Sequence, residues 1–236
     1  MRIAVLTPTY NERDNIKEFL VRIQAVAPSA HIYFVDDNSP DGTADLVAEH
    51  ARQDPRVNLI SRDGERGYAA ASREGLALLA SKSYDAIVTM DCDLSHDPTA
   101  IPVMLNQLRS GADMVIGSRY IPGGGVRNWS LFRRALSRWG NRYTALMLGV
   151  GVRDCTSGFR VYKPEVISSG IVASTTSNGY AFLSEVLMRL RQQSDRIVSE
   201  IPIIYSDRVA GVSKMDKTII KESMFLVTWW GLKRLF

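Results

Sequence analysis

Residues 1–43 read MRIAVLTPTYNERDNIKEFLVRIQAVAPSAHIYFVDDNSPDGT, and they hold two apolar runs around a helical pattern. Ile3 to Leu6 and Ile32 to Val35 are short and apolar, as buried strands are, whereas Asn15 to Val26 has apolar residues at helical spacing. Strand, helix and strand in this order predict a β-α-β unit with two parallel strands.

The same alternation of strands and helices continues as far as Gly117. Further strands are expected at Val57 to Ile60, Ala86 to Met90 and Asp113 to Ile116, and helices at Thr43 to Arg52, Tyr68 to Ala80 and Thr99 to Leu108. This pattern predicts an α/β fold with a mostly parallel sheet and helices on both faces. Ligands of such sheets bind outside the carboxyl ends of the strands, so functional residues are expected there.

The alternation stops after Gly117. Trp129 to Leu148 is expected to be a helix with basic residues interleaved, and Asp154 to Arg160 a loop. Tyr180 to Arg191 has the pattern of a second helix, and Ile197 to Ile204 that of an interrupted strand.

Residues 218–236 are assigned to an amphipathic helix that follows a single domain spanning residues 1–217. This segment carries two tryptophans, and lysines lie near both of its ends. Its uncharged core, Ser223 to Leu232, is shorter than the roughly 20 residues that cross a bilayer. Trp and Lys at headgroup level suit a helix that lies in a membrane interface. A helix that packs against the core or forms a dimer is the alternative.

The composition is that of a soluble, folded protein, with 45% hydrophobic and 23% charged residues among 236. Lys and Arg number 29 against 25 Asp and Glu, and this mild basic excess suits phosphate or an anionic membrane surface. No aromatic RNA-binding signature or zinc-finger spacing supports a nucleic-acid partner. Cys92 and Cys155 are expected to be free thiols, and the protein cytoplasmic, because a strand already begins near Met1 where a signal peptide would lie.

Two carboxylates, Asp91 and Asp93, follow the strand expected at Ala86 to Met90. Buried carboxylates one residue apart are costly unless a cation lies between them. A Mg²⁺ ion that carries a diphosphate would remove that cost, since Mg²⁺ uses one or two carboxylates together with phosphate oxygens. A strand that ends in a polar turn is the alternative explanation. Polar clusters also follow the first two strands, at Pro8 to Glu12 and Asp36 to Ser39, which favours one shared site.

Six segments in order resemble the family 2 glycosyltransferases with a GT-A type fold, and among these the polyprenol-phosphate (dolichol-phosphate) mannose synthases. The similarity extends from about Ile3 to Lys214, most of the chain. The segments are residues 7–12 (TPTYNE), 35–43 (VDDNSPDGT), 91–98 (DCDLSHDP), 117–120 (GSRY), 154–160 (DCTSGFR) and 208–214 (RVAGVSK). Each segment alone is a weak signal, whereas six in this order are a strong one.

The resemblance implies a donor site with a divalent metal ion. The residues that match the nucleoside-binding positions are Pro8, Tyr10, Glu12, Val35 and Asp37. The diphosphate would lie at Asp91, Cys92 and Asp93, and the metal, Mg²⁺ or Mn²⁺, at Asp91, Asp93 and Ser95. Cys92 stands where a small residue, often alanine, is usual in the family.

The resemblance also implies an acceptor phosphate held by Arg119, Arg133 and Ser137, a task that suits the paired donors of arginine. Arg133 could instead lie on a solvated helix face beside Arg134. Glu185 could be read as a general base, but a phosphate acceptor is already an anion, so a structural or positioning role is expected.

Arg208 and Lys214 match a mobile loop that is implied to close over the donor diphosphate. Closure of such a loop excludes water, which would otherwise hydrolyse the donor. The residues implied to act in catalysis are Asp93, Arg119, Arg208 and Lys214.

The implied function is transfer of mannose from GDP-mannose to a polyprenyl (dolichyl) phosphate, in one displacement with inversion. The alternatives are a UDP-glucose-dependent polyprenyl-phosphate glucosyltransferase and, without catalysis, a nucleotide-sugar-binding partner subunit. A phosphatase with an aspartate nucleophile is disfavoured, because its aspartate pair follows the first strand, where this chain has Thr7 and Pro8. A dehydrogenase is disfavoured because no Gly-rich turn follows that strand. The lipid acceptor implies the cytoplasmic face of a membrane, and a small membrane-protein partner is possible by analogy with relatives.

Overall fold

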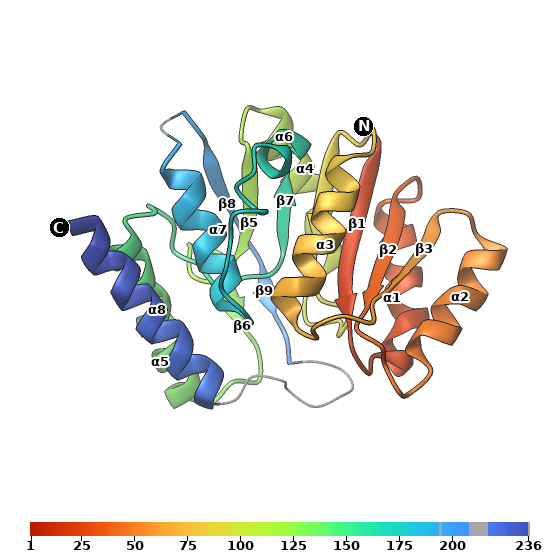
Figure 1. Cartoon of the computed structure of the whole chain (residues 1–236), viewed down its shortest axis with the longest axis horizontal. Helices are drawn as coiled ribbons and strands as arrows, with labels where there is room; N and C mark the ends of the chain where they lie inside the picture. The colour runs from red at the N-terminus through yellow and green to blue at the C-terminus, as the bar shows by residue number, and fades with distance from the viewer. Residues whose placement is uncertain (194, 208–216, 236) are drawn as a thin grey trace.

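The computed structural model describes residues 1–193, 195–207 and 217–235 (Figure 1). At its centre lies a seven-stranded sheet with the strand order β3-β2-β1-β4-β7-β5-β8. Its strands are β1 (Ile3–Thr9), β2 (His31–Asp36), β3 (Val57–Ser61), β4 (Ala86–Thr89), β5 (Met114–Ser118), β7 (Arg160–Tyr162) and β8 (Val198–Pro202). A second, two-stranded sheet pairs β6 (Gly125–Val126) with β9 (Ile204–Tyr205).

Neighbouring strands of the large sheet run parallel, as the sequence predicts, except at β7. This strand lies antiparallel between β4 and β5, and Arg160 is the register partner of both Thr89 and Ile116. An antiparallel strand starts where its neighbours end, so the residues before β7 reach the same edge of the sheet as the residues after β4. The sequence pattern indicates only a loop here, since a three-residue strand is too short to show a periodicity.

Helices cover both faces of the sheet (Figure 1). They are α1 (Arg13–Val26), α2 (Thr43–Gln53), α3 (Tyr68–Ala80), α4 (Ile101–Arg109), α5 (Leu131–Leu148), α6 (Pro164–Ser168), α7 (Ala181–Arg191) and α8 (Lys217–Leu235), with a short 3₁₀ turn at Pro98–Ala100. Residues of α1, α2 and α4 enclose one apolar core, and residues of α3, α6 and α7 the other. Along β1 the side chains alternate between the two cores, with Val5 in the first and Leu6 in the second.

The contact between α3 and the sheet is closest at Gly75. A Cβ atom at this position would lie 2.6 Å from Cδ1 of Leu6 and 2.9 Å from Cγ2 of Val35. Packed carbon atoms stay about 3.5–4.0 Å apart, so a larger residue would push α3 away from β1 and β2.

The C-terminal helix α8 lies along α5 (Figure 1). The hydroxyls of Tyr143 in α5 and Thr228 in α8 are 2.7 Å apart, and Val227 of α8 is buried in the core. Phe225 and Trp229 of the same helix are exposed. One side of α8 is therefore packed against the domain, as in the core-packing alternative, while another side presents apolar residues to the surface. The domain boundary after residue 217 stays a prediction. None of the helices within the described residues is long and apolar enough to cross a membrane.

Candidate active site

The acidic pair lies at the carboxyl edge of the sheet, directly after β4. Asp93 is buried and Asp91 is half-buried. The backbone N–H of Ser95 donates to Oδ1 of Asp93 at 3.0 Å, which fixes the orientation of that carboxylate. Between them Leu94 has a φ of +62°, a left-handed conformation that costs a leucine roughly 1–2 kcal/mol. Strain of this kind is typical of functional sites.

The Ser95 hydroxyl and the two aspartates fit a metal ion that is shared with a ligand. This hydroxyl is buried and makes no hydrogen bond of good geometry to any described residue, although the Tyr205 phenol lies next to it. Within the described part of the chain, no three His, Cys, Asp or Glu side chains gather into a complete metal cage. An ion held here would take its remaining ligands from phosphate and water, which is how Mg²⁺ is commonly bound.

His96 is buried beside the acidic pair and supports its loop. The backbone N–H of Asp91 donates to Nδ1 of His96 at 3.4 Å, and the imidazole ring lies 5.3 Å from the ring centroids of both Phe159 and Tyr205. Burial lowers the pKa of His96 to about 4, although the charge of Asp93 opposes that shift. The imidazole is therefore neutral near pH 7, as it must be for Nδ1 to accept a hydrogen bond.

The residues predicted to bind the nucleoside lie together at the ends of β1 and β2. Pro8 and Val35 are register partners in these strands. The side chain of Val35 is fully buried, so only its backbone can reach a ligand. Nδ2 of Asn15 donates to the buried Glu12 carboxylate at 2.7 Å, while the Glu12 N–H donates to Oγ1 of Thr43 at 3.0 Å. These contacts hold the first residues of α1 against the start of α2.

Two arginines from the segment after β3 contact this group. Arg62 forms a buried ion pair with Asp37, whose other oxygen accepts from the N–H of Gly67 at 2.8 Å. Arg66 lies over the ring of Tyr10, 5.2 Å from its centroid, and donates to its hydroxyl at 3.3 Å. A base that stacks on this face of Tyr10 would have to displace the Arg66 guanidinium.

Arg119, predicted to bind the acceptor phosphate, is engaged in a buried ion pair with Asp154. Its Nε and Nη2 each donate to one carboxylate oxygen of Asp154 at 2.7 Å, and Nη2 also donates to Oγ1 of Thr156 at 2.8 Å. Burial alone would raise the pKa of Asp154, but the charge and hydrogen bonds of Arg119 outweigh it and hold that pKa below its usual value. The pair is thus ionised at neutral pH.

The other two predicted acceptor residues belong to α5 and lie near this ion pair. Ser137 shares a hydrogen bond of 2.6 Å with the hydroxyl of Tyr120, whose ring lies under the Arg119 guanidinium. Arg133 is half exposed, donates to Asp207 at 3.2 Å, and lies 4.0 Å from the centroid of the Trp129 ring. Arg133 therefore has a single exposed carboxylate partner among the described residues.

Tyr205 joins the acceptor cluster to the metal motif. Its ring contacts the imidazole of His96 on one side and the indole of Trp129 on another, at centroid distances of 5.3 and 5.6 Å. The Arg119 guanidinium lies 5.5 Å from the same ring. Residues that the sequence places in separate segments are therefore brought into one continuous cluster. Arg208 and Lys214 lie outside the described residues, and their role stays a prediction.

Comparison with known proteins identifies the family. Residues 4–170 match the family described as "Glycosyl transferase family 2". The chain belongs to glycosyl transferase family 2. It is 41% identical over 233 residues to a polyprenol monophosphomannose synthase of Mycolicibacterium smegmatis, covering 98% of this chain and 88% of that protein. It is 37% identical over 232 residues to an undecaprenyl-phosphate mannosyltransferase of Micrococcus luteus, covering 98% and 95%.

Solved structures share the fold at low sequence identity. Glucosyl-3-phosphoglycerate synthase from Mycobacterium tuberculosis, in complex with Mn²⁺, UDP and phosphoglyceric acid, aligns with a TM-score of 0.70 and 18% identity over 99% of this chain and 78% of its own. A mannosyltransferase from Pyrobaculum calidifontis, in complex with GDP-mannose and Mn²⁺, aligns with a TM-score of 0.62 and 17% identity over 99% and 64%. The GT-A type fold predicted from the sequence is thereby confirmed, and this family 2 protein is an enzyme that transfers a sugar.

Glu185 makes the contacts that a structural or positioning role in this glycosyltransferase requires. The fully buried carboxylate accepts from the N–H groups of Thr176 and Ser177, from the Ser177 hydroxyl at 2.5 Å, and from Arg189 at 2.7 Å. Burial would raise the pKa of Glu185, but the hydrogen bonds from Ser177 and Arg189 hold it below its usual value. A carboxylate bound in this way is a poor proton acceptor, so it positions the segment before α7.

Several residues of the candidate glycosyltransferase site are not among those predicted from the sequence. Asp154 and His96 stand inside the segments that carried the resemblance, so their place was visible but their partners were not. Arg62 and Tyr205 stand in no such segment, and nothing in the sequence marked them. Each of the four is now seen to hold a predicted site residue or its loop in place.

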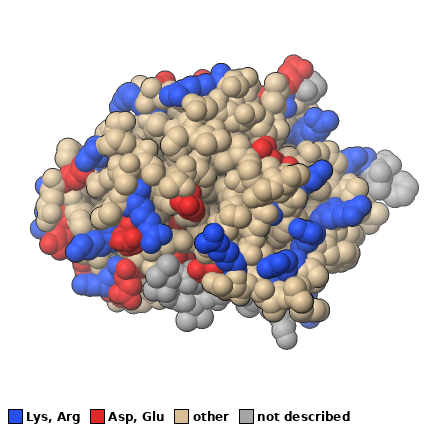
Figure 2. Space-filling model, turned by 180° about the vertical axis from the view of Figure 1, so that it is seen from behind, with Lys and Arg blue, Asp and Glu red and all other residues tan. Residues whose placement is uncertain are grey.

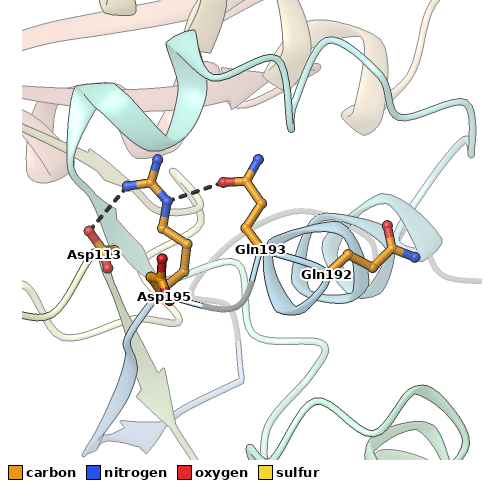
Figure 3. Close-up of a pocket in the computed structure, with 5 residues that line it drawn as sticks. Asp113, Gln192, Gln193 and Asp195 are labelled. Atoms are coloured by element: carbon orange, nitrogen blue, oxygen red, sulfur yellow. Dashed lines mark hydrogen bonds and ion pairs between the residues drawn. The ribbon is translucent and has the colours of Figure 1, made fainter.

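A cavity of about 430 Å³ lies at the opposite edge of the sheet (Figure 3). Asp113, which lines it, precedes β5, and Arg196 precedes β8, so the cavity is at the amino ends of these strands. Arg196 donates to Asp113 at 3.3 Å and to Gln193 at 3.1 Å, so its charge is already paired within the cavity wall. None of the motif residues lines this cavity, and it is not the active site.

Proposed function

We propose that this glycosyltransferase moves mannose from GDP-mannose to a polyprenyl phosphate, with inversion at the anomeric carbon and with Mg²⁺ or Mn²⁺ as cofactor. The observation that carries the proposal is the continuous cluster through Tyr205, because it sets the metal motif next to arginines suited to a second phosphate. Two relatives named for mannose transfer to polyprenyl phosphates, at 41% and 37% identity, support it. The GDP-mannose bound to the structural relative from Pyrobaculum calidifontis favours the same donor.

On this proposal the chain's own residues bind and orient the two substrates. Asp91, Asp93 and Ser95 would hold the ion, which when bound neutralises charge on the leaving diphosphate. Arg133, with its exposed partner Asp207, can exchange that carboxylate for the acceptor phosphate. Ser137 would donate to the same phosphate. The acceptor oxygen is already an anion, so no side chain has to remove a proton before it attacks the sugar.

Arg119 acts in the proposal as a pre-oriented guanidinium whose charge is already paired with Asp154. Its side chain is held by Asp154 on one side and lies against the Tyr120 and Tyr205 rings on the others. An arginine held in this way loses little conformational freedom when a phosphate arrives, so it can donate a hydrogen bond without reorganisation. Arg208 and Lys214 are proposed to add further positive charge at the donor diphosphate.

A lipid acceptor requires the site to meet a membrane, and the surface of α5 and α8 is proposed to provide that contact. Large apolar side chains are exposed on both helices: Leu131, Phe132, Leu136, Trp139, Leu146, Phe225, Trp229 and Leu232. Exposed basic residues accompany them: Arg134, Arg138, Arg142, Lys221, Lys233 and Arg234. Figure 2 shows blue side chains gathered on the side of the molecule that these two helices form.

The chemistry of this surface supports an anionic membrane as its partner. Apolar side chains can enter the region between headgroups and acyl chains, while arginine and lysine remain at the level of lipid phosphates. α5 carries Ser137 and Arg133 as well as the apolar residues, so a membrane bound here would present its lipid phosphates at the proposed acceptor site. The protein would then be peripheral on the cytoplasmic face.

The transfer reaction is tested with purified protein, Mg²⁺ or Mn²⁺, a short-chain polyprenyl phosphate in detergent, and GDP-mannose or UDP-glucose in parallel. A hexosyl phospholipid of the expected mass from GDP-mannose alone is the expected result. The same product from UDP-glucose alone would establish the glucosyltransferase instead. Binding of GDP-mannose without transfer to any acceptor would favour a nucleotide-sugar-binding subunit. Asp93→Ala serves as the matched inactive variant, because it removes one carboxylate of the metal site.

The membrane contact is tested by flotation with vesicles that contain anionic phospholipid. The double variant Leu131→Ser, Phe132→Ser removes two side chains that are 80% and 77% exposed and should abolish flotation while GDP affinity is kept. Its control is Val21→Ser, Val103→Ser, which removes two exposed apolar side chains from α1 and α4. Equal flotation of the two double variants would refute the assignment of this surface.

A further inference from the structure

Two tyrosines stack beside the acidic pair, where the proposed function assigns no residue. Tyr68 is the first residue of α3, and Tyr180 immediately precedes α7. Their rings are stacked, with centroids 5.1 Å apart and an interplanar angle of 18°. Both residues are half-buried, so part of the pair is accessible from the surface.

The Tyr68 hydroxyl and the Asp91 carboxylate both lie close to Gly158. A Cβ atom at Gly158 would lie 2.9 Å from the Tyr68 hydroxyl oxygen and 3.4 Å from Oδ1 of Asp91. Because glycine has no side chain, both groups can face this small space. A tyrosine phenol ordinarily has a pKa near 10. The phenol therefore keeps its proton and can donate a hydrogen bond at any physiological pH.

The backbone around this point is firmly held. The Thr89 hydroxyl donates to the carbonyl of Gly158 at 2.9 Å. The fully buried Arg160 donates to the carbonyls of Cys155, Ser157 and Leu183, each at 2.9 Å. Leu183 belongs to α7, so these bonds connect the loop before β7 with the helix that follows Tyr180. A site can distinguish similar ligands only when its contacting groups are held in this way.

We propose that Tyr68 donates a hydrogen bond to a hydroxyl of the donor hexose, with Tyr180 holding its ring in place, and that this contact helps to select the nucleotide-linked sugar. The inference rests on the proposed function, since a metal ion held by Asp91 and Asp93 would bring the diphosphate, and the hexose joined to it, near Tyr68. A site that hydrogen-bonds a substrate hydroxyl discriminates against ligands that lack or misplace it.

The test compares the nucleotide-sugar with the nucleotide alone. Tyr68→Phe removes the hydroxyl and keeps the stacked ring. With Mn²⁺ present, titration calorimetry should show about a three- to tenfold loss of affinity for GDP-mannose, as expected for one hydrogen bond, and unchanged affinity for GDP. Tyr84→Phe is the control, because it removes a buried hydroxyl that is 2.8 Å from that of Tyr33 at the far edge of the sheet. It should leave both affinities unchanged.

A second variant approaches the same point from the other side. Gly158→Ala puts a methyl group between the Tyr68 hydroxyl and Asp91. This variant should also lower the affinity for GDP-mannose more than the affinity for GDP. If Tyr68→Phe lowers the affinity for both ligands equally, or for neither, the inference is refuted. A hydroxyl with a purely structural role would affect the binding of both ligands alike. Absence of transfer by the wild-type enzyme refutes the proposed function, whereas transfer without discrimination by Tyr68→Phe refutes this inference alone.

Discussion

Replacing Asp154 with asparagine should lower the free energy of unfolding by about 3–5 kcal/mol. The reason is the position of its partner. Arg119 is 8% exposed, Asp154 is not exposed at all, and two of their nitrogen–oxygen distances are 2.7 Å. Asparagine preserves the shape of the side chain and one acceptor oxygen, but it removes the negative charge and the second acceptor, so the buried guanidinium charge is no longer compensated. An uncompensated buried charge is what makes such a change costly.

The assay is urea unfolding followed by tryptophan fluorescence, with thermal unfolding beside it. In a domain of this size 1 kcal/mol corresponds to about 2–4 °C, so the melting temperature should fall by roughly 6–20 °C. Glu18→Gln is the matched control, because the Glu18–Arg22 pair has the same 2.7 Å distance but is about half exposed. Exposed pairs contribute at most about 1 kcal/mol, so this variant should melt within a few degrees of the wild type.

A double variant separates loss of the pair from burial of a lone charge. Asp154→Asn combined with Arg119→Met removes both charges and should be more stable than Asp154→Asn alone. If Asp154→Asn costs no more than Glu18→Gln, the ion pair does not hold the acceptor side of the site and the reasoning fails. If the double variant is less stable than the single one, the cost does not come from an unpaired guanidinium.

Three further outcomes are expected. The pKa of Asp154 is held below its usual value, so the ionised carboxylate stabilises the folded protein fully above about pH 3.9. This stabilisation is lost as the pH falls through the folded-state pKa. The urea midpoints of the wild type should therefore approach those of Asp154→Asn below about pH 4. Gly75→Ala should cost about 1–3 kcal/mol by thermal unfolding, whereas Gly140→Ala in α5, where nothing lies within 4 Å of the added methyl group, should stabilise by about 0.5–1 kcal/mol. Glu185→Gln should lower the melting temperature but leave the pH dependence of transfer unchanged; loss of the acid limb of that profile would make Glu185 a base after all.

The parts of the fold that the sequence predicted are those with a strong local pattern. β1, β2 and β4 are runs of apolar residues buried on both faces, and they stand where the sequence placed them. The sequence does not predict β7 and α6, because three and five residues are too few to show a strand or helix periodicity. The direction of β7 depends on pairing with β4 and β5, which are distant in the sequence, so no local pattern contains it.

The sequence motifs predict which residues form the candidate site, but not the contacts that these residues make. The motifs include Asp93 and Arg119, which follow β4 and β5 at the same edge of the sheet. The sequence predicts a ligand as the partner of Arg119, whereas the structure pairs this residue with Asp154, 35 residues away. For Arg133 the sequence allows either binding of the acceptor phosphate or a position on a solvated helix face. In the structure Arg133 is half exposed, with Asp207 as its partner. Such partners are determined by tertiary packing, which cannot be derived from the pattern of a single sequence.

The insertion of β7 also bears on the order in which the molecule folds. The strands β3, β2, β1 and β4 come from residues 3–89 and pair only with one another up to the edge of β4. In the strand pairing of the described residues, β5 and β8 are connected to them through the three residues of β7, which pair with β4 on one side and β5 on the other. Contacts between segments close in sequence form at lower entropic cost than distant ones. The half of the sheet that carries the proposed donor residues can therefore assemble first, and the half that carries Arg119 is added when β7 pairs with both, so the proposed acceptor side of the site is completed last.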